Sequence, residues 1–182
     1  MLIKTIGAII VFFSCTAAGL FMAAKDKFRA EELVEMKRGL ILLKSEISYS
    51  SKPLYEAFIG ISEKLSDVAS EIFEDSGRML KSKKVSSASE AWEKTLKDRK
   101  DRSFFIKEDM DAFAALGQTF GGGDKDGQIL NIDLSIDYID LKTDELMKKY
   151  SKDGRLFRSA GVLGGILIVV VLFLEAGGRI WK

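Results

Sequence analysis

Carboxylates are the main side chains in this 182-residue sequence that could do chemistry. The chain has 27 acidic and 28 basic residues, no histidine and a single cysteine, Cys15. Without histidine, a Ser-His-Asp or Cys-His active site and a histidine-ligated metal are excluded. One cysteine also excludes an intramolecular disulfide and multi-cysteine zinc sites. The net charge of +1 leaves no excess positive field for nucleic acid. The composition therefore predicts no cofactor, no metal and no nucleic-acid partner.

Four aspartates near the C-terminal end form the most regular acidic pattern. Their spacing of four, three and four residues places them within about 60° of one another on a helix. Ile129, Ile132, Ile136 and Ile139 lie to one side of this stripe, and Leu130, Leu134 and Leu141 lie to the other. A solvated face is the most common meaning of such a stripe. The alternative is a contact strip for a partner, with the leucines supplying apolar burial. The aspartates are Asp133, Asp137, Asp140 and Asp144.

The glycine- and aspartate-rich stretch 121–127 also needs an interpretation. A P-loop requires glycine, four residues and then Gly-Lys-Ser/Thr, and the chain contains no such string. An EF-hand loop is excluded because Gln128 stands at a ligand position and the twelfth position is not glutamate. The stretch is therefore interpreted as a turn between two helices, with Asp124 capping the second helix.

Two uncharged segments are long enough to suggest membrane helices. Residues 5–24 span about 30 Å as a helix, which matches the hydrocarbon thickness of a bilayer. Residues 159–174 span about 24 Å and need slight bilayer thinning. A cleaved signal peptide is the alternative for the first segment, although Met22 is not the small residue that such cleavage sites prefer. We expect two transmembrane helices, a middle domain over 25–158 and a short tail over 175–182.

Small residues four apart suggest that the two membrane helices pack closely. Gly19 and Ala23 form such a pair in the first segment, and Gly161 and Gly165 form one in the second. This spacing lets helix backbones approach each other. Basic residues concentrate at both ends of the middle region, which predicts that this region is cytoplasmic and that both termini lie outside.

The middle region shows helical spacing almost throughout. A long helix with Leu33, Met36, Leu40 and Leu43 on one face is expected to end before Pro53, and a second helix starts with Pro53 at its first position. Later helices are expected after Ser66 or Asp67, after the capping box Ser87–Glu90, around Phe113, and after Asp124. The charged stretch 97–103 is expected to be a connection. The fold class is all-α, a bundle of about six helices whose first and last helices continue into the membrane helices.

Several short motifs lie along the chain in a recognisable order. They are Leu43, Glu46-Ile47, Tyr49, Pro53-Leu54, Glu56-Ala57-Phe58, Ala91-Trp92, Leu116-Gly117, Gly121, Asp124, Gln128 and the glycine-rich run 161–165. In this order they resemble the stage III sporulation protein AB family. Their order covers about residues 1–174. The chain departs from the family pattern at Lys52, where a threonine would cap the second helix, at the triple glycine 121–123, and in the tail after Leu174.

The resemblance implies a non-enzymatic role in a membrane complex that joins mother cell and forespore. It also implies a soluble domain similar to the cytoplasmic domain of platform protein F of type II secretion machines. The implied partners are a secretion-type ATPase, other membrane and ring-forming channel proteins, and the lipid bilayer. We expect a two-pass protein of the cell membrane with its domain on the mother-cell side. We expect the partner to contact the four aspartates together with Asp124 and Gln128.

Two rival functions remain at this stage. The first is a self-associating membrane scaffold without an ATPase partner, held by the glycines at 161–165 and the two heptad helices. The second is an enzyme that uses carboxylates, which needs two acidic side chains converging in a pocket and one with a raised pKa.

Overall fold

The computed structural model describes the backbone of residues 2–50, 52–122 and 124–177. It describes the side-chain surroundings of residues 13, 17, 24–50, 52–122 and 124–151. The described residues form six α-helices and one 3-10 turn, and no strand is found among them. The helices are α1 (Leu2–Tyr49), α2 (Leu54–Ser62), α3 (Asp67–Lys81), α4 (Ala88–Arg99), α5 (Lys107–Gly117) and α6 (Lys125–Gly177), and the 3-10 turn η1 covers Lys100–Arg102. The predicted all-α class is confirmed.

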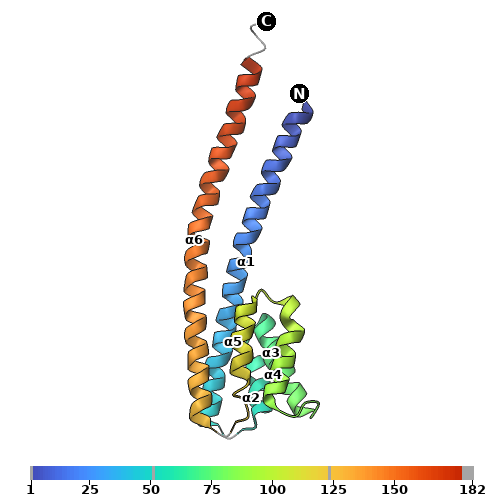
Figure 1. Ribbon diagram of the computed structural model, residues 1–182, viewed down its shortest axis with the longest axis vertical. Helices are drawn as coiled ribbons and strands as arrows, with labels where there is room; N and C mark the ends of the chain where they lie inside the picture. The colour runs from blue at the N-terminus through green and yellow to red at the C-terminus, as the bar shows by residue number, and fades with distance from the viewer. Residues whose placement is uncertain (1, 51, 123, 178–182) are drawn as a thin grey trace. The chain divides into compact units, whose positions relative to one another are not determined.

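The chain divides into two compact units. Residues 28–146 form one unit, which holds the short helices and parts of α1 and α6. Residues 1–27 and 147–182 form the other, in which Lys149 pairs with Asp26 at 2.7 Å. Figure 1 shows α1 and α6 as the two long helices of the chain. Each of them contains one of the predicted membrane segments, 5–24 and 159–174, in addition to residues of the helical bundle.

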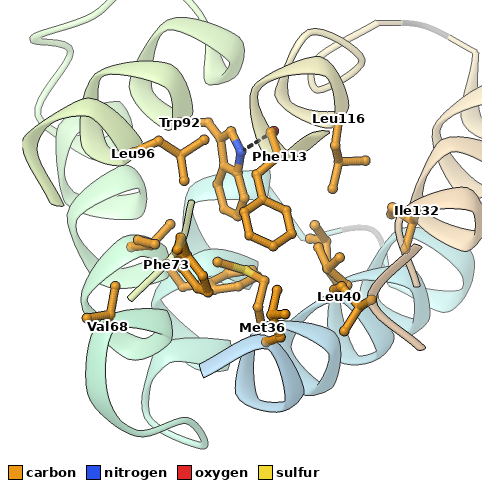
Figure 2. Packing of buried hydrophobic residues seen from close by; sticks show 14 of the residues in the cluster. Met36, Leu40, Val68, Phe73, Trp92, Leu96, Phe113, Leu116 and Ile132 are labelled. Atoms are coloured by element: carbon orange, nitrogen blue, oxygen red, sulfur yellow. Dashed lines mark hydrogen bonds between the residues drawn. The ribbon is translucent and has the colours of Figure 1, made fainter. Parts of the chain in front are cut away.

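The predicted apolar faces form the core of the 28–146 unit. Leu33, Met36, Leu40 and Leu43 of α1 are fully buried, and the isoleucine heptad of α6 is buried at Ile132 and Ile139. The short helices add aromatic rings, which meet around Trp92 (Figure 2). Phe58, Phe73 and Phe120 have ring centroids 5.2–5.7 Å from that of Trp92. These contacts join α2, α3, α4 and the turn after α5 into one core.

Trp92 also explains two of the motifs noted in the sequence. Its indole N–H donates a hydrogen bond of 2.8 Å to the Phe113 carbonyl, which satisfies the polar atom of an otherwise apolar side chain (Figure 2). Gly117, at the end of α5, lies directly against the indole ring, and a Cβ there would overlap Trp92 Cδ1. The motifs Ala91-Trp92 and Leu116-Gly117 are therefore two sides of one packing contact.

The helix starts predicted from the sequence agree with the structure except at α2. Ser87 accepts a hydrogen bond from the Glu90 N–H at 3.1 Å, as its capping box predicts. Helix α2 begins at Leu54 rather than Pro53, and no side-chain hydrogen bond caps it. Its first bonds run instead from the N–H groups of Glu56 and Ala57 to the Pro53 carbonyl. A backbone bond thus stands where a threonine side chain was expected to act.

The stretch 97–103 is not simply a connection. Helix α4 continues to Arg99, and η1 takes up the next three residues. Arg99 forms ion pairs with Glu71 and Asp75 of α3, so its charge stabilises the helix end instead of breaking it. The sequence suggested a connection because residues 97–103 are almost all charged, but two of them, Arg99 and Arg102, pair with α3.

Candidate functional site

The four aspartates of the predicted contact strip do not share one environment. Asp140 pairs with Lys37 and Asp133 pairs with Lys44 at 2.6 Å, so both carboxylates point toward α1. The two lysines are seven residues apart, as are the two aspartates, and the pairs run in opposite directions along the chain. These ion pairs therefore bind α1 and α6 of the 28–146 unit to each other in antiparallel register.

The other two aspartates lie on the open side of α6. Asp137 and Asp144 are exposed, and neither forms an ion pair with any residue that the structure describes. Beside them, Leu130, Leu134 and Leu141 have exposed fractions of 60%, 57% and 59%. Exposed leucines on one side of a helix mark a surface available for burial. The strip as a partner contact stays a prediction, and the described surroundings leave Asp137 and Asp144 as its unpaired members.

Asp124 and Gln128 lie at the turn between α5 and α6. The Asp124 carboxylate accepts a hydrogen bond of 3.1 Å from the Asp126 N–H, as expected for a residue that caps a helix. The Gln128 side-chain amide donates to the Gly122 carbonyl. Both residues thus order the turn. Their contact with a partner stays a prediction.

A cavity of about 330 Å³ opens at this end of the 28–146 unit, where the turn after α1 meets the turn before α6. Lys125, the first residue of α6, connects this helix to the end of α1, because its ammonium donates a hydrogen bond to the Ser48 carbonyl at 2.6 Å. The two family-like stretches, more than 60 residues apart in the sequence, meet here. From them come the lining residues Glu46, Ile47, Leu54, Ala57, Gly121 and Gln128.

A buried polar cluster was not anticipated from the sequence. Asp109, at the third position of α5, is fully buried. It accepts two hydrogen bonds of 2.8 Å from Arg29 of α1, one of 2.8 Å from the Tyr138 hydroxyl of α6, and one of 2.9 Å from the Ile106 N–H. Burial acts to raise the pKa of Asp109, but these donors outweigh it and hold the pKa below its ordinary value.

The pKa values of the other two side chains in the cluster are also shifted in the direction that favours the ion pair. The hydrogen bond to Asp109 raises the pKa of Arg29. Burial and the Asp109 carboxylate raise the pKa of the Tyr138 hydroxyl, so this hydroxyl stays a donor. An aspartate three residues after Ile106 is a weak helix-start signal that the sequence analysis passed over. Each carboxylate oxygen of Asp109 accepts two hydrogen bonds from within the fold, which makes the cluster structural.

A second cavity, of about 420 Å³, lies between α1, α3 and the segment before α5. Glu32 lines it and accepts a hydrogen bond of 2.7 Å from the Phe104 N–H. Burial, together with the nearby Asp67, raises the pKa of Glu32 to about 7 in spite of that hydrogen bond. Glu31, Glu71 and Arg102 also line the cavity. Across the described residues, no three His, Cys, Asp or Glu side chains are grouped so that they could hold a metal ion.

The membrane prediction concerns segments whose side chains are mostly outside the described residues. Over the described part of the chain, no helix combines the length and apolarity needed to cross a membrane. Segments 5–24 and 159–174 are helical, but nearly all of their side chains lie outside the described residues. The same holds for the proposed packing residues Gly19, Ala23, Gly161 and Gly165. The two-pass arrangement therefore stays a prediction.

Comparison with known proteins gives concordant results. The family model described as "Stage III sporulation protein AB" matches residues 4–173. Stage III sporulation protein AB of Bacillus subtilis (strain 168) is 26% identical over 171 residues, which cover 94% of this chain and 99% of the relative. A solved structure of stage III sporulation protein AB aligns with a TM-score of 0.64 at 25% identity, covering 68% of this chain and 97% of the other.

Proposed function

Because this chain belongs to the stage III sporulation protein AB family, we propose that it is a non-enzymatic membrane platform of the sporulation channel complex between mother cell and forespore. In this proposal its helical domain docks a secretion-type ATPase, and its other neighbours are the membrane and ring-forming proteins of the channel. The observation that carries the proposal is the extent of α1 and α6. Each helix includes a predicted membrane segment together with residues of the bundle.

The charge pattern of the chain supports a cytoplasmic domain, and the family resemblance implies the mother-cell side. Basic residues flank the domain where it would leave the bilayer, among them Lys25, Lys27 and Arg29 on one side and Lys148, Lys149 and Lys152 on the other. The short outer ends carry only Lys4, Arg179 and Lys182. Positively charged loops remain preferentially in the cytoplasm.

A binding role also agrees with how the carboxylates are used. Asp133 and Asp140 are neutralised by lysines, and Asp109 is held by three donors. The cavity at Glu32 meets the condition set for an enzyme, because Glu32 has a raised pKa and other carboxylates line the same cavity. Glu32 is held by the Phe104 N–H, however, and Glu71 is paired with Arg99 and Arg102. Of the four strip aspartates, the two that remain unpaired among the described residues, Asp137 and Asp144, lie on an exposed helix face rather than in a cavity, as suits contact with another protein.

A pull-down from sporulating cells of the native host tests the proposal. The full chain, kept in solution by a mild detergent, serves as bait, and recovery of a secretion-type ATPase is the expected result. Charge reversal of Asp140 would be a poor probe, because it would place a second ammonium beside Lys37 and disturb the domain itself. Asp137→Lys with Asp144→Lys leaves both ion pairs intact, and Glu93→Lys on exposed α4 is the matched control.

The outcome separates the proposal from its rival. Failure of the correctly folded bait to recover any such ATPase, combined with recovery of further copies of this chain, would favour a self-associating scaffold. Recovery of the ATPase by both the parent chain and the Glu93→Lys variant supports docking.

A further inference from the structure

The outer face of α6 carries a second helix-pairing seam. Positions 130, 134, 137, 141 and 144 follow each other at intervals of four, three, four and three residues. They fall within about 80° of one another and extend over about 21 Å of helix. This is the spacing by which a helix presents one seam to another helix. The outer row is defined as Leu130, Leu134, Asp137, Leu141 and Asp144.

The outer row differs from the inner isoleucine seam of the same helix in being uncovered. On the inner seam Ile132, Ile139 and Leu146 are buried against the bundle. The three leucines of the outer row are each more than half exposed, and its two aspartates make no ion pair with described residues. Val34 and Ile41 of α1, exposed by 52% and 48%, each precede by three residues a lysine that pairs with α6.

The negative charge of the outer row determines which kind of partner could cover it. The two lysines of α1 that pair with this helix, Lys37 and Lys44, are already committed to Asp140 and Asp133. Asp137 and Asp144, one heptad apart among apolar side chains, form no ion pair with a described residue, and the exposed Lys148 follows Asp144 by one turn at the end of the row. Burial of a carboxylate is unfavourable unless a cation accompanies it. A covering helix must then bring basic groups at two positions seven residues apart.

A second copy of this chain that presents the same outer row in these two arrangements does not meet that requirement. In a parallel pair of outer rows, each Asp137 faces Asp137 and each Asp144 faces Asp144. In an antiparallel pair centred on Asp137, the two Asp137 side chains meet and Leu130 faces Asp144. Each arrangement opposes like charges or buries a carboxylate against a leucine. An anionic lipid surface is disfavoured by the same two aspartates.

We propose that the outer row of α6 is the docking seam for one amphipathic, basic helix of a partner protein. That helix carries apolar residues at alternating intervals of three and four, and Lys or Arg at two positions seven residues apart opposite Asp137 and Asp144. The inference rests on the proposed docking role and specifies which face performs it. The leucines supply burial, and the aspartates fix the register of the pairing.

Site-specific photo-cross-linking in sporulating cells of the native host tests the inference on the full chain. A benzophenone amino acid is placed at Leu134, with the same group at Glu93 of α4 as the control, and the cross-linked peptide is mapped by mass spectrometry. The expected product from position 134 is a segment with the stated apolar spacing and two basic residues a heptad apart. A segment of this same chain, a lipid adduct, a segment without that basic pair, or no product would overturn the inference.

Charge reversal provides the second arm. Asp137→Lys with Asp144→Lys is expected to lower the cross-linking yield at position 134 about tenfold, because two opposed pairs become repulsive. Exchanging the two mapped basic residues of the partner for glutamate should restore the yield. The milder Asp137→Asn with Asp144→Asn should give an intermediate loss, and Glu93→Lys none. An unchanged yield in the charge-reversed chain would refute the charge pairing.

The two proposals fail in distinguishable ways. Recovery of the ATPase by the charge-reversed chain at the parent level would leave the docking role standing and remove the outer row as its surface. If the cross-link from position 134 maps to a basic helix of a different protein and no ATPase is recovered, the outer row is still a docking seam, but the ATPase is not its partner.

Discussion

At the scale of single residues, Asp109 is the point where three helices depend on one carboxylate. Arg29, Tyr138 and the start of α5 all donate to it, and its own side chain is fully buried. The sequence could not indicate this cluster, because Asp109 stands in the charged run 107–111 and looks like a surface residue. Its donors are 80 and 29 residues away, and nothing local marks them as neighbours.

Replacement of Asp109 by asparagine should destabilise the 28–146 unit strongly. The substitution leaves the guanidinium of Arg29, whose side chain is 12% exposed, without its counter-charge. Loss of one member of a buried pair costs about 3 kcal/mol. Urea unfolding followed by far-UV circular dichroism measures the change. Asp111→Asn, which removes an exposed pair with Lys107, is the control and should alter stability little; equal effects of both variants would contradict the structural role of the cluster.

Glu32 should make the stability of the 28–146 unit fall as the pH rises. Its carboxyl has a pKa of about 7 in the fold against an ordinary value of 4.5, so the folded state binds the proton more tightly. The unfolded state then holds fewer protons between about pH 4.5 and 7, and stability declines across that interval. Burial of the charge, with Asp67 nearby, is the cause.

The Glu32→Gln variant removes that titration and retains an oxygen that can accept the Phe104 N–H. Its melting temperature should exceed that of the parent chain at about pH 8, and the difference should shrink toward about pH 5. Glu93→Gln, at an exposed position of α4, serves as the control for removal of one negative charge. A Glu32→Gln melting curve that shifts with pH in parallel with the parent would show that Glu32 is not the titrating group.

At the scale of elements, apolar periodicity predicted most of the bundle. The buried faces of α1 and α6 agree with the residues chosen for them, because a 3-4 repeat of large apolar side chains has few alternatives to helix packing. The contact strip was different. Its spacing indicated a shared face, yet Asp133 and Asp140 turn toward Lys44 and Lys37. Only the antiparallel register of α1 and α6, which no local pattern encodes, separates them from Asp137 and Asp144.

Close approach of α5 to α4 should make Gly117 intolerant of any side chain. A Cβ at this position would overlap the Trp92 ring, which is fixed by its hydrogen bond to the Phe113 carbonyl and by three neighbouring aromatic rings. Gly117→Ala is therefore expected to destabilise the unit by about 2 kcal/mol through overpacking. Gly60→Ala is the matched control, since no atom lies within 4 Å of its Cβ position in α2.

The two alanine variants should shift urea midpoints in opposite directions. Gly60→Ala gains helix propensity, worth up to about 1 kcal/mol in a helix interior. Tolerance of Gly117→Ala would mean that the contact between α5 and Trp92 is looser than described. Destabilisation by Gly60→Ala would mean that the Gly60 position is not an open control.

At the scale of the whole molecule, the proposed platform role depends on the two apolar segments anchoring the chain. The composition predicted these segments directly, because 20 and then 16 consecutive uncharged residues stand out in a chain that is 30% charged. The partner surface could not be predicted in the same way. Its leucines differ from core leucines only in what covers them, and covering depends on how the helices pack.

A charge placed at the centre of each segment should release the chain from membranes. A lysine at the middle of a membrane helix costs roughly 3 kcal/mol, so Ser14→Lys or Leu167→Lys alone leaves the other segment as an anchor. The double variant should move from the alkali-resistant membrane pellet to the supernatant when cell fractions are washed with carbonate and immunoblotted. Ser45→Lys, on an exposed position of α1, adds the same charge outside the segments and should stay in the pellet. If the double variant also stayed in the pellet, the anchors would lie elsewhere and the platform proposal would lose its basis.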